Sequence, residues 1–269
     1  MNILSLMAFL LAGAVLGFGI QMSGGIKEFM DPHAALIVVG GTIAAGSISF
    51  QVDRIFMMFK VFFKRVLKQQ KMNYPVLISE LMGLSEAYRT NSPKLDDLIK
   101  KIQDPFLRES MQALMDEALE PQSLVRVLRS RIKTMFQRQS DEVLKFKTLG
   151  KYPPAFGLMG TTLSMITLLK RLAEPGAQKI LGPAMALGLI ATFYGLVLAN
   201  MIFNPIAENL ADSSREAKIK NTIIVEGIRL ILLKTNPVVL AEELNSFLLP
   251  SERIDWKKAA AGNVGKKAA

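Results

Sequence analysis

The sequence predicts an all-α, polytopic membrane protein with four transmembrane helices and a helical cytoplasmic domain. Half of its 269 residues are hydrophobic and the mean hydropathy is +0.29, which favours a membrane protein. Four stretches carry no charge and are long enough to cross a bilayer as helices: Met1–Ile26, Pro32–Val52, Tyr152–Leu169 and Ile180–Ala207. The long segment between the second and third stretches is basic and has helical periodicity.

The distribution of charge predicts the topology. Of the 33 Lys and Arg residues, 19 fall in Val52–Lys151, 10 follow Pro205 and four lie in the two short connections. By the positive-inside rule the long middle segment and the tail are cytoplasmic, and four spans then place both termini on that side. Topology therefore accounts for the net charge of +10, and we expect a lipid bilayer and no nucleic acid as partner.

The first span, Met1–Ile26, is expected to be a retained helix. It has no basic n-region and is longer than the core of a signal peptide. Gly13 and Gly17 form a GxxxG spacing, which is typical of close helix packing in lipid. His33, the only histidine, follows in a short connection, where it is interpreted as a polar anchor and not a ligand.

The second span is predicted as a helix over Ala34–Phe50. Its glycines and alanines again indicate a face for close packing. We expect the helix to continue into Ile55–Gln70, which is amphipathic, basic and rich in Phe and Met, as an interfacial helix is.

The cytoplasmic segment is predicted to be entirely helical. Tyr74–Arg89 is periodic, and the pairs Ser92-Pro93 and Asp104-Pro105 each resemble an N-cap followed by proline at the first helical position. Pro121 opens a long helix that is expected to reach the membrane at Tyr152.

The third span, Tyr152–Leu169, begins with two prolines and contains adjacent threonines, Thr161 and Thr162. Pro154 lacks an N–H, so a backbone carbonyl is expected to lose its usual partner and, beside a hydroxyl, to suit a hard cation. The alternative is that each threonine bonds only the preceding turn of its own helix.

The fourth span is predicted as a helix over Leu181–Phe203 that Pro205 ends. Its small residues at four-residue spacing, Ala191, Gly195 and Ala199, indicate a second close-packing face. A helix around Glu208–Lys234 and another after Pro237 are expected to follow.

These elements give a five-part division. Residues 1–51 hold transmembrane helices 1 and 2, 52–151 the cytoplasmic domain, 152–205 transmembrane helices 3 and 4, 206–249 the C-terminal cytoplasmic helices and 250–269 a disordered basic tail. No enzyme motif is present, so we expect a protein that is not an enzyme. None of the four spans contains Asp, Glu, Lys or Arg, so an ion path would need a carboxylate from a partner.

Four strings resemble the MotA/PomA family of flagellar stator proteins: DPHAALIVVGGT (Asp31–Thr42), PAFGLMGTTLSMITLL (Pro154–Leu169), LGPAMALGLIATFYGLVLANMIFNPIAENL (Leu181–Leu210) and NPVVLAEELNSFL (Asn236–Leu248). The resemblance implies a pentamer of this chain in the bacterial inner membrane around a dimer of a MotB/PomB-type protein. That partner supplies a membrane aspartate, and ion flow past it drives the rotor switch ring. The resemblance implies no cofactor beyond a transported sodium ion or proton.

By resemblance, the ion-pathway residues are Asp31, Pro154, Thr161, Thr192 and Pro205. The two prolines match those tied to ion-driven movement, and Asp31 matches an acidic residue associated with ion access. The two threonines match hydroxyls of sodium-type members, so the resemblance favours sodium over protons, with a sodium ion near both. A second threonine that is common beside Thr192 is Ala191 here, and this departure from the family pattern weakens the argument for sodium.

The resemblance also points to residues that face the rotor. Family members carry an Arg followed eight residues later by a Glu; Arg89 matches the Arg, and Asp97 stands where the Glu is expected, with Asp96 as a substitute. From the residues alone, these charges are a solvated face. The alternative function is that of an ExbB/TolQ-like energiser of envelope transport, although such proteins typically have three spans.

Overall fold

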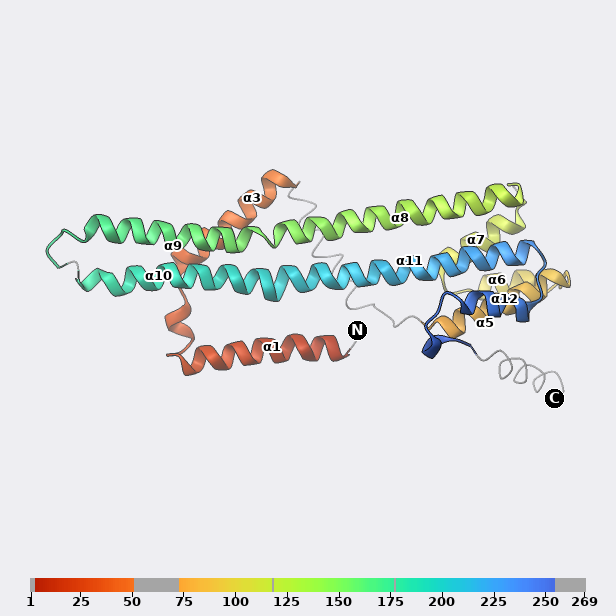
Figure 1. Cartoon of the computed structure of the whole chain (residues 1–269), viewed down its shortest axis with the longest axis horizontal. Helices are drawn as coiled ribbons and strands as arrows, with labels where there is room; N and C mark the ends of the chain where they lie inside the picture. Colours follow the sequence, from red (N-terminus) through yellow and green to blue (C-terminus); the bar gives the residue numbers. More distant parts are fainter. Residues whose placement is uncertain (1–2, 51–72, 118, 177, 255–269) are drawn as a thin grey trace. The chain divides into compact units, whose positions relative to one another are not determined.

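The computed structural model describes residues 3–50, 73–117, 119–176 and 178–254 (Figure 1). They form helices joined by short connections, with no strand among them, which confirms the all-α prediction. The chain divides into two compact units: Met1–Gln70 with Gln139–Ser213, and Lys71–Arg138 with Ser214–Ala269. We call them the first and second units.

The first unit contains the apolar helices. Its elements are α1 (Ile3–Met22), η1 (Ile26–Phe29), α2 (Pro32–Ala35), the π-helical η2 (Leu36–Gly40), α3 (Gly41–Ser49), α9 (Tyr152–Arg171), α10 (Gln178–Val197) and the π-helical η3 (Leu198–Phe203). Two described helical runs, Pro32–Ser49 and Gln178–Leu232, are long and apolar enough to cross a membrane. The other two predicted spans form α1 and α9, each a helix of 20 residues.

Helices α9 and α10 pack with their backbones in close contact. A Cβ added at Gly195 would lie 2.5 Å from the Pro153 carbonyl oxygen, and one at Gly157 would lie 2.9 Å from that of Ala191. Ala191 itself is fully buried. The small residues predicted as a packing face of α10 therefore lie against α9 of the same chain.

The run Pro32–Ser49, here called the strap, crosses the α9–α10 pair (Figure 1). Ala34 and Val38 form a small buried cluster with Ala191 of α10. Gly41 has the Phe156 ring of α9 where a side chain would stand. Hydrophobic and small residues thus fix the strap to both helices.

The second unit has a single large apolar core. Its helices are α5 (Tyr74–Arg89), α6 (Leu95–Lys101), α7 (Pro105–Met115), α12 (Pro237–Asn245), η4 (Pro250–Glu252) and the adjoining parts of α8 (Pro121–Leu149) and α11 (Asn204–Leu232). The most deeply buried side chains include those of Ile78, Leu81, Leu107, Met111, Ile224 and Ile228. The helices expected at Tyr74–Arg89 and from Pro121 onwards are present at those residues.

Three predicted boundaries are wrong. The second apolar helix ends at Ser49, within one residue of the predicted Phe50, but it does not run on as expected, because Phe50 adopts an extended conformation and packs beside a buried cluster around Phe146 and Phe203. Ser92 does not cap a helix; α6 begins at Leu95, after a turn in which the Leu95 N–H bonds the Ser92 carbonyl. By contrast, the Asp104 carboxylate caps α7 by accepting the Leu107 N–H at 3.0 Å.

The third wrong boundary is at Pro205, which does not end the fourth helix. Helical structure continues from Gln178 to Leu232, and the π-helical η3 immediately precedes the proline. A wider turn accommodates a residue that has no N–H to donate and whose ring crowds the preceding turn. The predicted interfacial helix over Ile55–Gln70 lies outside the described residues, as does most of the predicted tail, 255–269.

Candidate ion-pathway site

Thr161 and Thr192 lie together between α9 and α10. Their hydroxyl oxygens are 2.6 Å apart, although they are 31 residues apart in sequence. The Thr161 hydroxyl also lies 2.8 Å from the Gly188 carbonyl oxygen of the facing helix. The structure therefore brings together the two threonines that the sequence singled out.

Each threonine also bonds the preceding turn of its own helix. Thr161 Oγ1 is 3.2 Å from the Gly157 carbonyl oxygen, and Thr192 Oγ1 is 3.3 Å from that of Gly188. The ordinary threonine bond and the contact between helices thus coexist. We call Gly157, Thr161, Gly188 and Thr192 the seam.

The seam places four oxygen atoms in one small region, two from hydroxyls and two from carbonyls. The glycines permit this approach, since a Cβ at Gly188 would lie 3.2 Å from Thr161 Cα. Neutral oxygens of this kind are ligands for hard cations. The described residues contain no cluster of three or more His, Cys, Asp or Glu residues that could hold a metal ion, so the seam would need a charged partner to bind a cation strongly.

The residues beside the two seam threonines are directed elsewhere. Thr162 is exposed and bonds only the Leu158 carbonyl of its own helix, at 2.9 Å. Ala191 is buried against the strap, and a Cβ at Gly160 would collide with it. A threonine at position 191 would be crowded by the strap. Position 191 is not part of the seam, so the seam is complete although Ala191 stands there.

The expected freed carbonyl at Pro154 is absent. Helix α9 begins at Tyr152, so both prolines fall in its first turn, where no intrahelical N–H bond is made in any case. The prediction was wrong because it placed the proline inside the helix. The seam carbonyls, at Gly157 and Gly188, come instead from residues whose small size brings the helices close.

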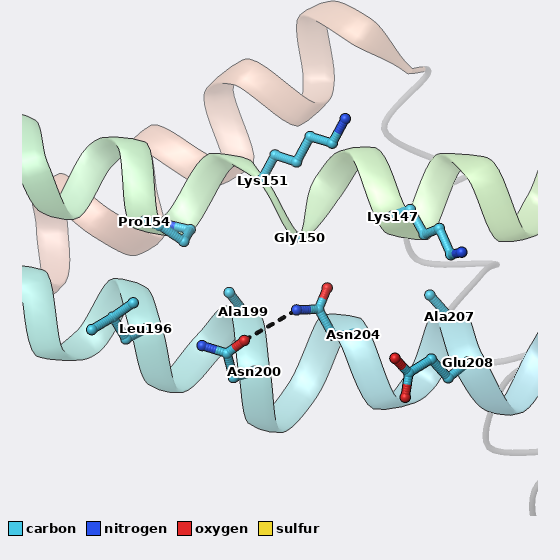
Figure 2. A pocket seen from close by; sticks show the side chains of 10 residues that line it. All are labelled: Lys147, Gly150, Lys151, Pro154, Leu196, Ala199, Asn200, Asn204, Ala207 and Glu208. Carbon is cyan, nitrogen blue, oxygen red and sulfur yellow. Dashed lines mark hydrogen bonds between the residues drawn. The ribbon is translucent and has the colours of Figure 1, made fainter.

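A cavity of about 660 Å³ is lined by residues of α8, α9, α10, η3 and α11 (Figure 2). It is lined by Lys147, Gly150, Lys151, Pro154, Leu196, Ala199, Asn200, Asn204, Ala207 and Glu208. Pro154 lies seven residues before Thr161 on α9, and Leu196 lies four residues after Thr192 on α10, so these two cavity residues share helix faces with the seam. Figure 2 shows Lys147 extending toward the facing helix, whereas Lys151 points away from it.

The amide and carboxylate groups of the cavity come from η3, which holds Asn200, and from the start of α11, which holds Asn204 and Glu208. The Asn204 amide donates to the Asn200 side-chain oxygen at 3.2 Å. Asn204 Oδ1 also lies close to Gly150, where an added Cβ would be only 3.0 Å from it. Glu208 contributes a carboxylate, with no described cation within salt-bridge distance. The cavity therefore offers amide and carboxylate oxygens beyond the neutral seam.

Asp31 immediately precedes the strap and caps α2. Its Oδ1 accepts the N–H groups of His33 and Ala34 at 2.8 and 2.9 Å. The phenol of Tyr194, on α10, accepts the Asp31 N–H at 3.2 Å and donates to the Phe29 carbonyl. Asp31 is therefore held near the helix that carries Thr192, but it is not part of the seam.

Arg89 and the two aspartates lie on exposed helix ends in the second unit. Arg89, in the last turn of α5, pairs with Glu86 at 3.0 Å, and both side chains are nearly half exposed. Asp96 and Asp97 occupy the first turn of α6, where negative charge is favourable. Neither aspartate pairs with Arg89, so all three charges remain accessible to a partner.

Comparison with known proteins agrees with this architecture. Residues 98–221 match the MotA/TolQ/ExbB proton channel family. The protein YtxD of Bacillus subtilis, described as uncharacterized, is 32% identical over 91% of this chain and 87% of its own length. Motility protein A of Borreliella burgdorferi is 32% identical over 88% of this chain and 90% of its own. The chain belongs to the motility protein A family.

The fold of a solved family complex is also similar. A structure of Campylobacter jejuni MotAB superposes with a TM-score of 0.80 at 21% identity, covering 93% of this chain and 97% of the other. Membership of an ion-channel family confirms that the chain is a membrane protein and not an enzyme. It is also consistent with the four predicted spans.

Several residues of the site escaped sequence reasoning. Tyr194 and the cavity residues Lys147 and Glu208 received no role, because their importance depends on which helices face each other. The seven-residue separation of Pro154 and Thr161 was a usable signal, since residues seven apart share a helix face. In the fourth helix, repeated steps of four residues would have joined Thr192 to Asn200 and Asn204.

Proposed function

We propose that this chain is the membrane subunit of a flagellar stator, coupling cation flow to torque on the rotor. The observation that carries the proposal is the seam, two hydroxyls and two carbonyls held together inside predicted spans that contain no Asp, Glu, Lys or Arg. Family membership supports it. The chain supplies neutral oxygens, so the titrating charge comes from elsewhere.

The charge comes from a MotB/PomB-type partner with a single span and a membrane aspartate. The solved MotAB complexes that resemble this chain support such a partner. A pentamer of this chain would surround a dimer of the partner in the inner membrane. Excess Lys and Arg in the middle segment and the tail supports a cytoplasmic location for both termini.

Sodium is the proposed coupling ion. A proton relay needs a group that titrates, whereas a partly dehydrated sodium ion needs several neutral or anionic oxygens. The seam offers hydroxyl and carbonyl oxygens, and the partner's aspartate would complete the set. Protons are the alternative, and the dependence of swimming speed on sodium separates the two.

The ion is proposed to leave through the cavity lined by Asn200, Asn204 and Glu208. These groups line the same cavity as Pro154, which lies seven residues before Thr161 on α9. Glu208→Gln removes the charge but keeps the shape, so it should lower maximum swimming speed without changing the sodium concentration that gives half-maximum speed. A shift of that half-saturating concentration alone would instead place Glu208 in ion entry.

Torque is proposed to pass to the rotor switch ring through Arg89 and the pair Asp96 and Asp97. Their exposure supports this role, because accessible charges steer and orient a partner more than they stabilise a fold.

Deletion of the gene tests the overall proposal. Cells should assemble flagella but fail to swim, and the wild-type gene should restore swimming. Normal swimming in a strain that also lacks any paralogous stator would contradict the proposal. Intact motility with defective import of ligands across the envelope would instead favour the ExbB/TolQ-like alternative.

A further inference from the structure

Tyr194 lies on α10, here called the conducting helix because it carries Thr192, and bonds the connection Phe29–Asp31 that precedes the strap. Its phenol oxygen donates to the Phe29 carbonyl and accepts the Asp31 N–H at 3.2 Å. One side chain thus satisfies two backbone groups on either side of Met30. Beside it, the rings of Phe29 and Phe193 pack edge to face, with centroids 5.6 Å apart.

These contacts fix Asp31 from two directions. Tyr194 holds its backbone, and the first N–H groups of α2 hold its carboxylate. Tyr194 is also only two residues from Thr192, so the connection and the seam share one rigid helix. The acidic residue is therefore set at a fixed position relative to the hydroxyl pair.

A second tyrosine fastens the other end of the strap. The Tyr152 phenol, at the start of α9, lies 2.6 Å from the Ser49 hydroxyl, at the last residue of α3. One tyrosine of the α9–α10 pair therefore bonds the connection just before the strap, and another bonds the last residue of the strap. Only the bond at the Asp31 end places an acidic residue.

We propose that Tyr194 is a positioning residue that sets the apparent ion affinity by holding Asp31 at a fixed place near the conducting helix. The proposal rests on the proposed ion-driven function. Loss of the phenol hydroxyl frees the Phe29 carbonyl and the Asp31 N–H and lets the connection move. The ring and its packing against Phe193 remain, so the helices keep their arrangement.

Tyr194→Phe tests the proposal, with Tyr152→Phe as the matched control that removes the hydroxyl bond at the other end of the strap. Membrane amounts, and swimming speed against sodium concentration, are measured for both variants. Tyr194→Phe removes both hydrogen bonds of the phenol, and it should raise the half-saturating sodium concentration about three- to tenfold with nearly unchanged maximum speed. Tyr152→Phe should leave the half-saturating concentration unchanged.

Two outcomes would overturn the proposal in favour of a structural role for Tyr194. One is an equal shift of the half-saturating sodium concentration in the two variants. The other is a Tyr194→Phe protein with fewer membrane copies and an unchanged half-saturating concentration.

A second measurement is independent of ion preference. The chain has no cysteine, so Met30→Cys gives a unique thiol for a nitroxide label on the connection. In the purified stator complex, Tyr194→Phe should narrow the label's spectrum and Tyr152→Phe should not.

The two proposals can fail separately. If the wild type ignores sodium, the proposed coupling ion is wrong, and the label at position 30 still decides whether Tyr194 orders the connection. If the label's spectrum is unchanged by Tyr194→Phe, the positioning role is wrong, whatever the ion.

Discussion

Single residues at this site act through placement more than through charge. Thr161 and Thr162 are neighbours with the same side chain, but only Thr161 reaches the facing helix. Asp31 is acidic, yet part of its carboxylate is used in capping α2. Residue type therefore identified the candidates, and helix geometry separated those that meet from those that do not.

A charge reversal at Arg89 tests its proposed role in contacting the rotor. Arg89→Glu should reduce torque, because it places a like charge beside Glu86 and reverses the sign presented to the rotor. Protein stability should change little, since exposed ion pairs contribute about 0–1 kcal/mol. Swimming speed and membrane amount are the measurements.

The control for Arg89 is Arg131→Glu, which breaks another exposed ion pair of the second unit, between Arg131 and Glu109. Arg131→Glu should swim nearly as well as wild type. If the two variants swim equally, Arg89 belongs to a solvated face and the rotor contact lies elsewhere.

Glu80 gives a prediction about pH. Burial, and then the nearby Asp104 carboxylate, raise the pKa of Glu80 above its ordinary value. The folded state therefore holds this proton more strongly than the unfolded state, and stability falls as pH rises through the interval between the two pKa values. Glu80→Gln cannot ionise and should be more heat-stable than wild type above that interval.

The difference between Glu80→Gln and wild type should shrink as pH falls to the unfolded pKa. Thermal unfolding of the purified complex at several pH values measures it. A constant difference across pH would mean that the amide changes packing and that ionisation of Glu80 has no influence on stability.

The packing of α9 on α10 depends on glycines that leave no room for a side chain. Gly195→Ala would place its methyl group 2.5 Å from the Pro153 carbonyl oxygen, which belongs to the backbone and cannot rotate away. Overpacking of this kind costs about 1–3 kcal/mol. We expect lower membrane amounts, weaker swimming, or both.

Gly182→Ala is the matched control for Gly195→Ala, because it lies in the same helix and an added Cβ there meets nothing within 4 Å. It should behave as wild type. Normal swimming and normal membrane amounts in Gly195→Ala would contradict the close approach of α9 and α10.

Helix positions were largely predictable from proline, charge and periodicity. Tyr74–Arg89 and the long helix from Pro121 to Leu149 are where those patterns placed them. The prediction that Pro205 ends the fourth helix was wrong. A proline usually ends a helix, but here the π-helical η3 widens the preceding turn and the helix continues. Phe50 is not helical and packs against a cluster whose residues are distant in sequence. Local sequence patterns do not show such long-range contacts.

For the molecule as a whole, the resemblance of four sequence strings identified the family. Of the residues predicted to line the ion pathway, Thr161 and Thr192 are the pair that the fold brings into contact. Sequence could not show that the Gly157 and Gly188 carbonyls complete the seam, because this needs the register of α9 against α10. The role of Tyr194 was also not predictable from the sequence, because its partners are about 165 residues away. Contacts between distant segments account for what was missed.

The central claim is that the coupling ion passes Thr161 and Thr192, and swimming speed against sodium concentration tests it most directly. Wild type and the Thr162→Ala control should show similar curves that rise with sodium and saturate. The double variant Thr161→Ala, Thr192→Ala should lose most of its sodium-dependent speed while reaching the membrane in normal amounts. If its curve superimposes on that of the wild type, the hydroxyl pair is not on the ion path.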